Sequence, residues 1–132
     1  MTKESMNALI ITDGSEPVQI IAKSISCMMP GHKVKICSAD NFSGTDLLPV
    51  ECFLIGCENP KPESFSYLEE MLSHINLASR KCGLFSSKEK TIKYLLKIVK
   101  DCEADVCEPL FIKNENIKDS DIKKWLKGFM DD

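Results

Sequence analysis

The sequence predicts an α/β fold, a three-layer sandwich in which helices cover both faces of a parallel sheet. Short apolar runs alternate along the chain with longer segments in which apolar residues recur at spacings of three and four, the pattern of one helical face. Strands that alternate with helices are joined by right-handed crossovers, and such crossovers make the strands parallel. The 132 residues are expected to form one domain, residues 1–132, with roughly two thirds of the unfolded-chain surface buried.

Five apolar runs are too short for helices and are interpreted as strands. They cover residues 8–11, 34–37, 52–55, 82–85 and 106–112. Pro109 in the last run has no N–H to donate to a ladder, which fits an edge strand or a bulge. We therefore expect the fifth strand at an edge of the sheet.

Four segments have helical spacing, and each presents one apolar stripe to the core. The stripes are Val18, Ile21, Ala22 and Ile25, then Phe65, Leu68, Leu72 and Ile75, then Ile92, Leu95, Leu96 and Val99, and finally Ile122, Trp125, Leu126 and Phe129. Trp125 is interpreted as a core anchor of the last helix. The connection over residues 38–49 should hold at most one helical turn, because Gly44 and Pro49 interrupt its periodicity.

Composition and charge exclude several classes of protein. Hydrophobic residues make up 43% and charged residues 28%, as in ordinary globular domains. A net charge of -3 argues against general affinity for nucleic acid, which rests on Lys and Arg neutralising phosphates. The polar start "MTKESMNAL" has no apolar signal-peptide core, and no stretch approaches the roughly 18 apolar residues of a spanning helix. We expect a cytoplasmic monomer with no membrane or nucleic-acid partner.

The seven cysteines are expected to be reduced rather than paired. Their number is odd, no CxxC motif is present, and most fall in apolar strand-like or helical patterns. They are interpreted as small buried hydrophobes, and no metal site is expected. Cys57 ends a strand before a helix, where a thiolate can be stabilised, but no base or resolving partner is nearby in sequence, so packing is the favoured interpretation.

Three loops are the places to look for a ligand, because open parallel sheets bind ligands beyond the carboxyl ends of their strands, where the strand order reverses. These loops cover residues 12–17, 56–64 and 86–90. The candidate ligand-binding residues are Thr12, Asp13, Gly14, Ser15 and Glu16 in the first loop, Gly56, Cys57, Glu58 and Asn59 in the second, and Ser86 and Ser87 in the third. No catalytic side chain is assigned.

Several short motifs resemble those of the short-chain flavodoxin-like family. They are "ALIIT" at the first strand, "SAD" after the second and "LIGC" at the end of the third. The resemblance spans nearly the whole chain from Asn7 onward. It implies a five-stranded sheet of order 2-1-3-4-5, with flavin mononucleotide (FMN) bound between the first and third strands. The function that it implies is FMN-dependent electron transfer to or from a redox partner protein.

The first loop departs from the family's Ser/Thr-x-Thr-Gly-x-Thr phosphate pattern. Here the turn reads "TDGSEP", about one residue shorter. Thr12 and Ser15 offer hydroxyls and Gly14 permits close approach of the backbone, as in a phosphate site at a helix N-terminus. Asp13 and Glu16, however, place two carboxylates beside a bound dianion. A helix cap by Ser15 or Asp13 explains the same residues and is favoured over phosphate binding.

The second and third loops lack the aromatic residues that the family places against the flavin ring. Neither "CENPKPES" nor "SSKEK" contains Trp, Tyr or Phe, and Tyr67 just beyond the second loop is a possible substitute. Lys88 and Lys90 would raise the potential of a bound flavin. The lysines over residues 88–100 and 113–127 are otherwise spaced as the solvated sides of helices.

Two other functions are compatible with the same fold. A flavin-free interaction module would use the loops to bind a protein partner, and the missing aromatics and acidic first loop favour it. A receiver-like signalling domain would use Asp13, Ser86 or Ser87, and Lys113. That third hypothesis ranks lowest, because Glu58 stands where a phosphoacceptor Asp is needed.

Overall fold

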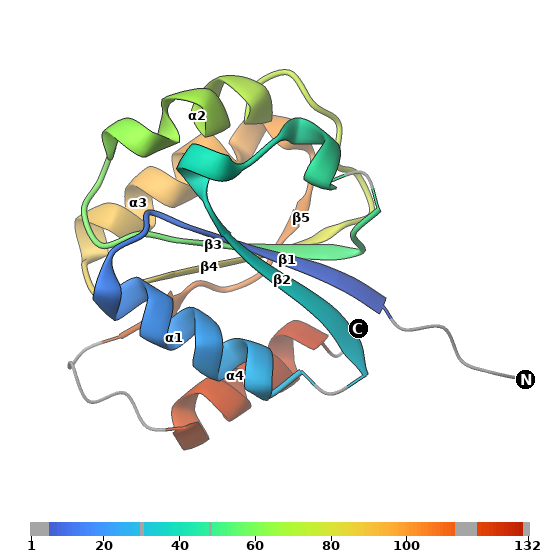
Figure 1. The fold of residues 1–132 in the computed structure, drawn as a ribbon, viewed down its shortest axis with the longest axis vertical. Coiled ribbons are helices and arrows are strands. Elements are labelled where there is room, and N and C mark those ends of the chain that lie inside the picture. Colours follow the sequence, from blue (N-terminus) through green and yellow to red (C-terminus); the bar gives the residue numbers. More distant parts are fainter. Residues whose placement is uncertain (1–5, 30, 48, 113–118, 131–132) are drawn as a thin grey trace, which may run out of the picture.

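The computed structural model describes residues 6–29, 31–47, 49–112 and 119–130. A parallel sheet forms its middle layer (Figure 1). The strands are β1 (Met6–Thr12), β2 (His32–Ser38), β3 (Cys52–Gly56), β4 (Lys81–Ser86), β5 (Asp105–Val106) and β6 (Leu110–Phe111). Their order is β2-β1-β3-β4-β5, and β6 also pairs with β4, which confirms the predicted order. Among the described residues no helix is long and apolar enough to cross a membrane.

In the described part of the chain, four α-helices cover the two faces of the sheet (Figure 1). The helices are α1 (Glu16–Cys27), α2 (Ser66–Leu72), α3 (Glu89–Ile98) and α4 (Asp119–Met130). One apolar cluster lies between the sheet and α2 with α3, and it includes Phe53, Leu68 and Leu95. The other lies between the sheet and α1 with α4, and it includes Ile10 and Phe129. The predicted three-layer sandwich is confirmed.

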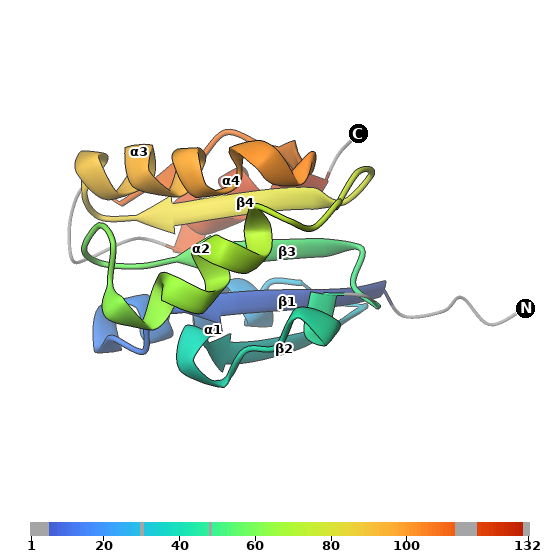
Figure 2. The same cartoon turned by 90° about the horizontal axis from the view of Figure 1, so that it is seen from above.

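The connection from β2 to β3 differs from the prediction of at most one helical turn. It contains two single 3-10 turns, η1 (Ala39–Asn41) and η2 (Gly44–Leu47). The second turn is closed by a side chain, since the Asp46 carboxylate accepts the Ser43 N–H at 3.0 Å. Seen from above in Figure 2, these turns lie beside β2, while α2 and α3 cover the more central strands.

The fifth strand is at an edge, as predicted, but it is not continuous over residues 106–112. The chain pairs with β4 as β5, leaves the ladder, and pairs with it again as β6. Pro109, which has no N–H, lies in the interval between the two pieces. The break is bracketed by hydrogen bonds from Cys107 N–H to the Cys82 carbonyl at 2.9 Å and from Ile112 N–H to the Ser86 carbonyl at 2.9 Å.

Two of the predicted helical stripes are corrected by the structure. The α2 helix ends at Leu72, so Ile75 lies beyond it, although it still packs against the α2 and α3 side of the core. Leu95 in α3 and Val99 directly after it are buried as predicted, but Ile92 is half-buried and Leu96 is 40% exposed. The buried polar residue on this helix is Thr91, whose hydroxyl donates to the Glu58 carbonyl at 3.0 Å. Burial of Leu95 and Val99 in the core, with the Thr91 hydrogen bond on the same side, orients this helix and leaves Leu96 at the surface.

The described cysteines and Trp125 agree with their predicted roles in most respects. All seven thiols are free. Cys52, Cys57, Cys82 and Cys102 are buried, Cys37 and Cys107 are half-buried, and Cys27 is exposed. Trp125 is half-buried against the α1 and α4 cluster, stacks on Phe129 at 5.4 Å, and donates its indole N–H to the Glu108 carbonyl at 2.7 Å.

The glycine that ends β3 is required by packing against its neighbour strand. A Cβ at Gly56 would lie 2.3 Å from the Phe85 ring, which is fully buried. We predict that Gly56→Ala lowers the free energy of unfolding by about 1–3 kcal/mol, the usual cost of overpacking. Gly128→Ala is the matched control, because a Cβ there meets nothing within 4 Å and the helix gains about 1 kcal/mol. Urea unfolding of both variants checks this, and equal stabilities for the two would contradict it.

Candidate functional site

The three candidate loops meet at the carboxyl ends of β1, β3 and β4, as the sequence predicts. In the ladder, Thr12 at the end of β1 pairs with Gly56 at the end of β3, and Gly56 pairs with Phe85, next to Ser86. We call the residues 12–17, 56–64 and 86–90 together the loop edge. Two side-chain contacts hold these loops to one another, and a third holds the second loop to α3.

Asp13 joins the first loop to the second. Its carboxylate accepts two hydrogen bonds from Ser15, from the backbone N–H at 3.0 Å and from the hydroxyl at 2.6 Å. The second carboxylate oxygen accepts the Glu58 N–H from the next loop at 2.9 Å. Hydrogen bonds to a charged acceptor contribute more than neutral ones, about 1.5–3 kcal/mol each. We call this arrangement of Asp13, Ser15 and Glu58 the Asp13 bracket.

The Asp13 bracket depends on Gly14, which lies between Asp13 and Ser15. Gly14 has φ of +82°, a left-handed conformation that glycine adopts without the strain of a side chain. The chain therefore turns back on itself, and the Asp13 carboxylate meets Ser15 two residues later, the local pattern that Asp and Asn favour in turns. Ser15 is the N-cap residue of α1, but its side chain makes no cap hydrogen bond. The predicted helix cap by Ser15 or Asp13 is thus wrong, because these side chains bond to each other.

The Thr12 hydroxyl, like that of Ser15, forms hydrogen bonds within the chain. Thr12 is buried, donates its hydroxyl to the Gln19 side-chain oxygen at 3.1 Å and accepts the Gly14 N–H at 3.2 Å. The donors that the sequence nominated on Thr12, Gly14 and Ser15 for a phosphate therefore all have partners within this chain. Glu16 follows at the start of α1, exposed to solvent.

The second and third loops are tied by Glu58 and Asn59. The Glu58 carbonyl accepts the Thr91 hydroxyl at 3.0 Å, and the Lys88 ammonium donates to the Asn59 side-chain oxygen. Ser86 is buried, and its hydroxyl accepts the Lys88 N–H at 3.2 Å, while Ser87 is exposed. Each loop is thus bonded to the next across the carboxyl edge of the sheet.

Cys57 belongs to this edge and is buried, as the packing interpretation predicts. Burial raises the pKa of the Cys57 thiol to about 12, and the Asp13 carboxylate adds to the rise. A thiol with so high a pKa is protonated at neutral pH and is a poor nucleophile.

The aromatic side chains next to the loop edge are engaged elsewhere. The Tyr67 hydroxyl accepts the Gly44 N–H at 3.0 Å, and its ring lies 6.0 Å from that of Phe42, in the connection after β2. Tyr94 donates its hydroxyl to the Glu69 carboxylate at 2.6 Å, and burial followed by this hydrogen bond raises the Tyr94 pKa. Tyr67 is therefore directed toward another connection rather than toward the three loops.

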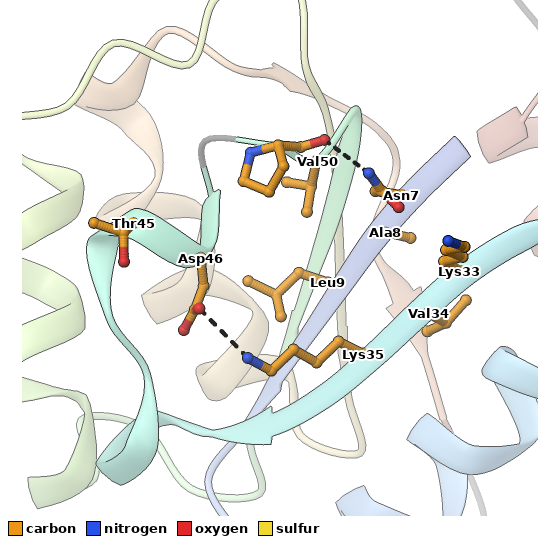
Figure 3. Close-up of a pocket in the computed structure, with 10 residues that line it drawn as sticks. Asn7, Ala8, Leu9, Lys33, Val34, Lys35, Thr45, Asp46 and Val50 are labelled. Atoms are coloured by element: carbon orange, nitrogen blue, oxygen red, sulfur yellow. Dashed lines mark hydrogen bonds and ion pairs between the residues drawn. The ribbon is translucent and has the colours of Figure 1, made fainter. Parts of the chain in front are cut away.

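A separate hollow lies at the amino-terminal half of β1 and β2 (Figure 3). It has a volume of about 560 Å³, and η2 forms one of its walls. Two pairs of its polar groups bond to each other, since Lys35 pairs with Asp46 at 3.4 Å and Asn7 donates to the Pro49 carbonyl at 3.3 Å. Its residues were not nominated from the sequence, because the hollow arises from the two 3-10 turns that replace a longer crossover helix.

Comparison with solved structures identifies the architecture. A flavodoxin of Streptococcus pneumonia TIGR4 superposes with a TM-score of 0.79 at 13% sequence identity, covering 94% of this chain and 97% of that one. The fold is flavodoxin-like. Oxidised flavodoxin 2 of Bacillus cereus gives a TM-score of 0.77 at 16% identity over 93% and 97% of the two chains. No protein-family model and no curated protein matches the sequence.

The flavodoxin-like neighbours include one with FMN bound. The Fusobacterium nucleatum flavodoxin bound to flavin mononucleotide has a TM-score of 0.70 and 13% identity, over 92% of this chain and 95% of that one. The residues of the present chain do not fit that group at the phosphate turn, because the Asp13 carboxylate takes the donors of Ser15 and faces the Glu58 amide.

Three further features bear on the metal-site and receiver-like hypotheses. Among the described residues no group of three or more His, Cys, Asp or Glu side chains is placed to hold a metal ion. Lys113, which the receiver-like hypothesis requires, lies outside the described residues. Asp13, which that hypothesis also requires, forms the bracket.

The raised Cys57 pKa predicts a loss of stability in alkali. The thiol stays protonated in the folded protein up to a pKa of about 12, whereas the unfolded chain ionises near 9.0. This contribution is complete below pH 9 and falls by about 1.4 kcal/mol per pH unit as the pH rises toward 12. Urea unfolding between pH 8.5 and 11 should therefore show a shallower decline for Cys57→Ala than for the wild type. Cys27→Ala, at an exposed position, controls for loss of a thiol, and equal slopes for wild type and Cys57→Ala would contradict the prediction.

Proposed function

We propose that this chain is a flavodoxin-fold protein that acts as a protein-interaction module and carries no resident FMN. The Asp13 bracket supports the proposal most directly, because a carboxylate already takes the donors at the turn where the resemblance would place a phosphate. A phosphate brought within a few ångströms of that carboxylate is repelled by about 1 kcal/mol per pair of charges even in water, and by more where water is excluded.

The other two loops support the same proposal. Planar cofactors are held by aromatic faces, and the segments 57–64 and 86–90 contain no Phe, Trp or Tyr. Tyr67, the nearby substitute, is bonded to Gly44. A flavin at the loop edge would therefore lose both the phosphate contacts and the stacking contacts that bind it.

The bonded loops suit protein docking for a different reason. Loops that are already ordered lose less conformational entropy when a partner binds. The Asp13–Glu58, Thr91–Glu58 and Lys88–Asn59 contacts supply that order from within the chain.

FMN-dependent electron transfer is the second candidate, and the flavodoxin-like fold favours it. In that case the backbone of Gly56 to Asn59 and of Ser86 and Ser87 would lie along the ring, and the flavin would supply the redox chemistry. Thr12, Gly14 and Ser15 would have to exchange their internal hydrogen bonds for phosphate contacts. The physiological partner would then be a redox protein.

A flavin titration separates the two candidates. Quenching of flavin fluorescence is followed as nucleotide-free protein is added to FMN or to riboflavin, which has no phosphate. We expect the wild type to bind neither at micromolar concentrations. Asp13→Asn removes the charge from the bracket and should gain affinity for FMN over riboflavin by about fivefold, the equivalent of about 1 kcal/mol.

Glu16→Gln is the matched control for the Asp13 substitution, because it removes a charge from the same turn but none of the bracket's hydrogen bonds. Circular dichroism verifies that both variants fold. Micromolar, FMN-selective binding by the wild type would contradict the interaction-module proposal and support electron transfer. Equal gains from Glu16→Gln and Asp13→Asn would contradict the specific role of the bracket.

A further inference from the structure

The strand β2 is an outer strand of the sheet, and one of its edges has no partner strand in the described part of the chain. All seven of its residues, from His32 to Ser38, pair with β1 on the other edge. The connection that follows β2 leads to β3 through 3-10 turns, and none of its described backbone groups bonds to the backbone of residues 33–37. An unpaired strand edge is a template for pairing with another strand.

The backbone groups on this open edge belong to Val34 and Ile36. The Asn7 carbonyl in β1 accepts the Glu51 N–H, so the backbone of Asn7 is directed toward β3 and that of the next residue, Ala8, toward β2. Ala8 is in register with Val34, and in a parallel ladder a residue bonds to the two neighbours of its register partner. The backbone groups of Val34 and Ile36 are therefore directed away from β1, and they have no hydrogen-bond partner among the described residues.

The side chains of β2 alternate between two faces of different chemistry. Lys33 and Lys35 are exposed, and Lys35 is in register with Leu9, which lies on the α2 and α3 side of the sheet. Val34 and Ile36 are on the opposite side, half-buried against the α1 and α4 cluster. Along the open edge, cationic side chains on one face thus alternate with aliphatic side chains on the other.

The hollow shown in Figure 3 gives the two lysines a common surface. Lys33 and Lys35 both line it, together with Leu9 of β1 and Val50, which precedes β3. Its volume is about 560 Å³, since the connection after β2 consists of 3-10 turns, and α2 and α3 cover the more central strands (Figure 2). Side chains of an added strand therefore have room on the lysine face.

The charge that lines this hollow is positive on balance. Among the described residues of its lining, Asp46 is the only acid beside the two lysines. Asp46 pairs with Lys35 at 3.4 Å, but the Lys35 side chain is 65% exposed, and such surface pairs contribute at most about 1 kcal/mol. Lys33 has no ion pair in the described part of the chain, and the exposed Glu51 does not line the hollow. Lys33 is therefore a cation available to a carboxylate of a partner.

A second copy of this chain is a poorly matched occupant of the open edge. Antiparallel pairing of the whole of β2 with the same strand of another copy would place Lys35 opposite Lys35 of that copy. Like charges directly opposite each other destabilise a strand pair, and lysines on edge strands commonly prevent such self-pairing. An acidic strand meets the opposite condition, because its carboxylates would lie opposite the lysines.

We propose that the open edge of β2 binds an extended segment of a partner protein in which acidic and aliphatic residues alternate. The segment adds a strand to the sheet, a mode of recognition in which backbone hydrogen bonds supply affinity and alternate side chains supply specificity. Its backbone bonds to that of Val34 and Ile36, and its aliphatic side chains pack against the same two residues. Its carboxylates lie opposite Lys33 and Lys35. The inference goes beyond the function proposed above and is independent of flavin binding, because these four residues lie outside the loop edge.

The test follows a synthetic peptide on the ¹⁵N-labelled protein by NMR. The probe is a capped peptide of about eight residues, within the usual length of a strand, in which glutamate and valine alternate. The control peptide has the same composition, with all of its glutamates before all of its valines. We expect the alternating peptide to shift the Val34 and Ile36 amides and to slow their hydrogen exchange by at least about tenfold, and the control peptide to leave them unchanged.

Two variants test the backbone contact and the charge contact. Val34→Pro removes an N–H that has no partner among the described residues, and proline is tolerated on edge strands where the N–H faces solvent. It should weaken binding of the alternating peptide by at least about tenfold, because a backbone hydrogen bond of the added strand is lost. Lys33→Glu should weaken binding by about fivefold, because an attractive cross-strand pair becomes a repulsive one.

Lys100→Glu is the matched control for Lys33→Glu, since Lys100 is exposed after α3 and lies outside the β2 edge. Circular dichroism verifies that each variant folds. If Val34→Pro does not fold, the comparison of Lys33→Glu with Lys100→Glu carries the test alone. Sedimentation equilibrium at the NMR concentration measures self-association in parallel.

Every other outcome overturns the proposal. No shift at Val34 and Ile36, equal shifts with the control peptide, or equal effects of the two lysine substitutions would remove the β2 edge as a site for an alternating acidic segment. Shifts confined to Asp13 and Glu58 would place docking at the loop edge. A dimer that Val34→Pro dissociates would make a second copy the occupant. The flavin titration decides the interaction-module function separately from these results.

Discussion

The carboxylate of Asp13 is the interaction on which the loop edge depends. It accepts two hydrogen bonds from Ser15 and one from the Glu58 amide, and so joins the ends of β1 and β3 without any ligand. The left-handed Gly14 makes the turn possible. The Asp13 carboxylate, an anion of the chain itself, thus takes the donors of the turn that follows β1. The same carboxylate contributes to the high pKa of buried Cys57, which keeps that thiol protonated at neutral pH.

Glu58 connects the first loop to α3. Its N–H binds Asp13, and its carbonyl accepts the Thr91 hydroxyl from α3. Glu58 therefore joins the second loop both to the first loop and to α3. On α3, Leu95 packs in the core while Leu96 is exposed.

The layers and strand order could be predicted from sequence because apolar periodicity directly reports which faces are buried. The details that differed depend on tertiary contacts. The sequence alone allowed Asp13 to be a helix cap or a repulsive neighbour of a phosphate, but its actual partner, the Glu58 amide, is 45 residues away. Leu96 fits a helical stripe as well as Leu95 does, and the packing of the helix against the sheet decides between them. Pro109 signalled an irregular edge strand, but not that pairing with β4 resumes after it.

Amide hydrogen exchange at Glu58 tests the central claim most directly. If the Asp13 carboxylate holds the loops together in the ligand-free protein, the Glu58 N–H is protected from exchange in the wild type. That protection falls in Asp13→Asn, whereas amides in the centre of β3 keep theirs. A Glu58 amide that exchanges in the wild type as fast as in an unstructured peptide would contradict the account, because the first two loops would then not be joined by this bond.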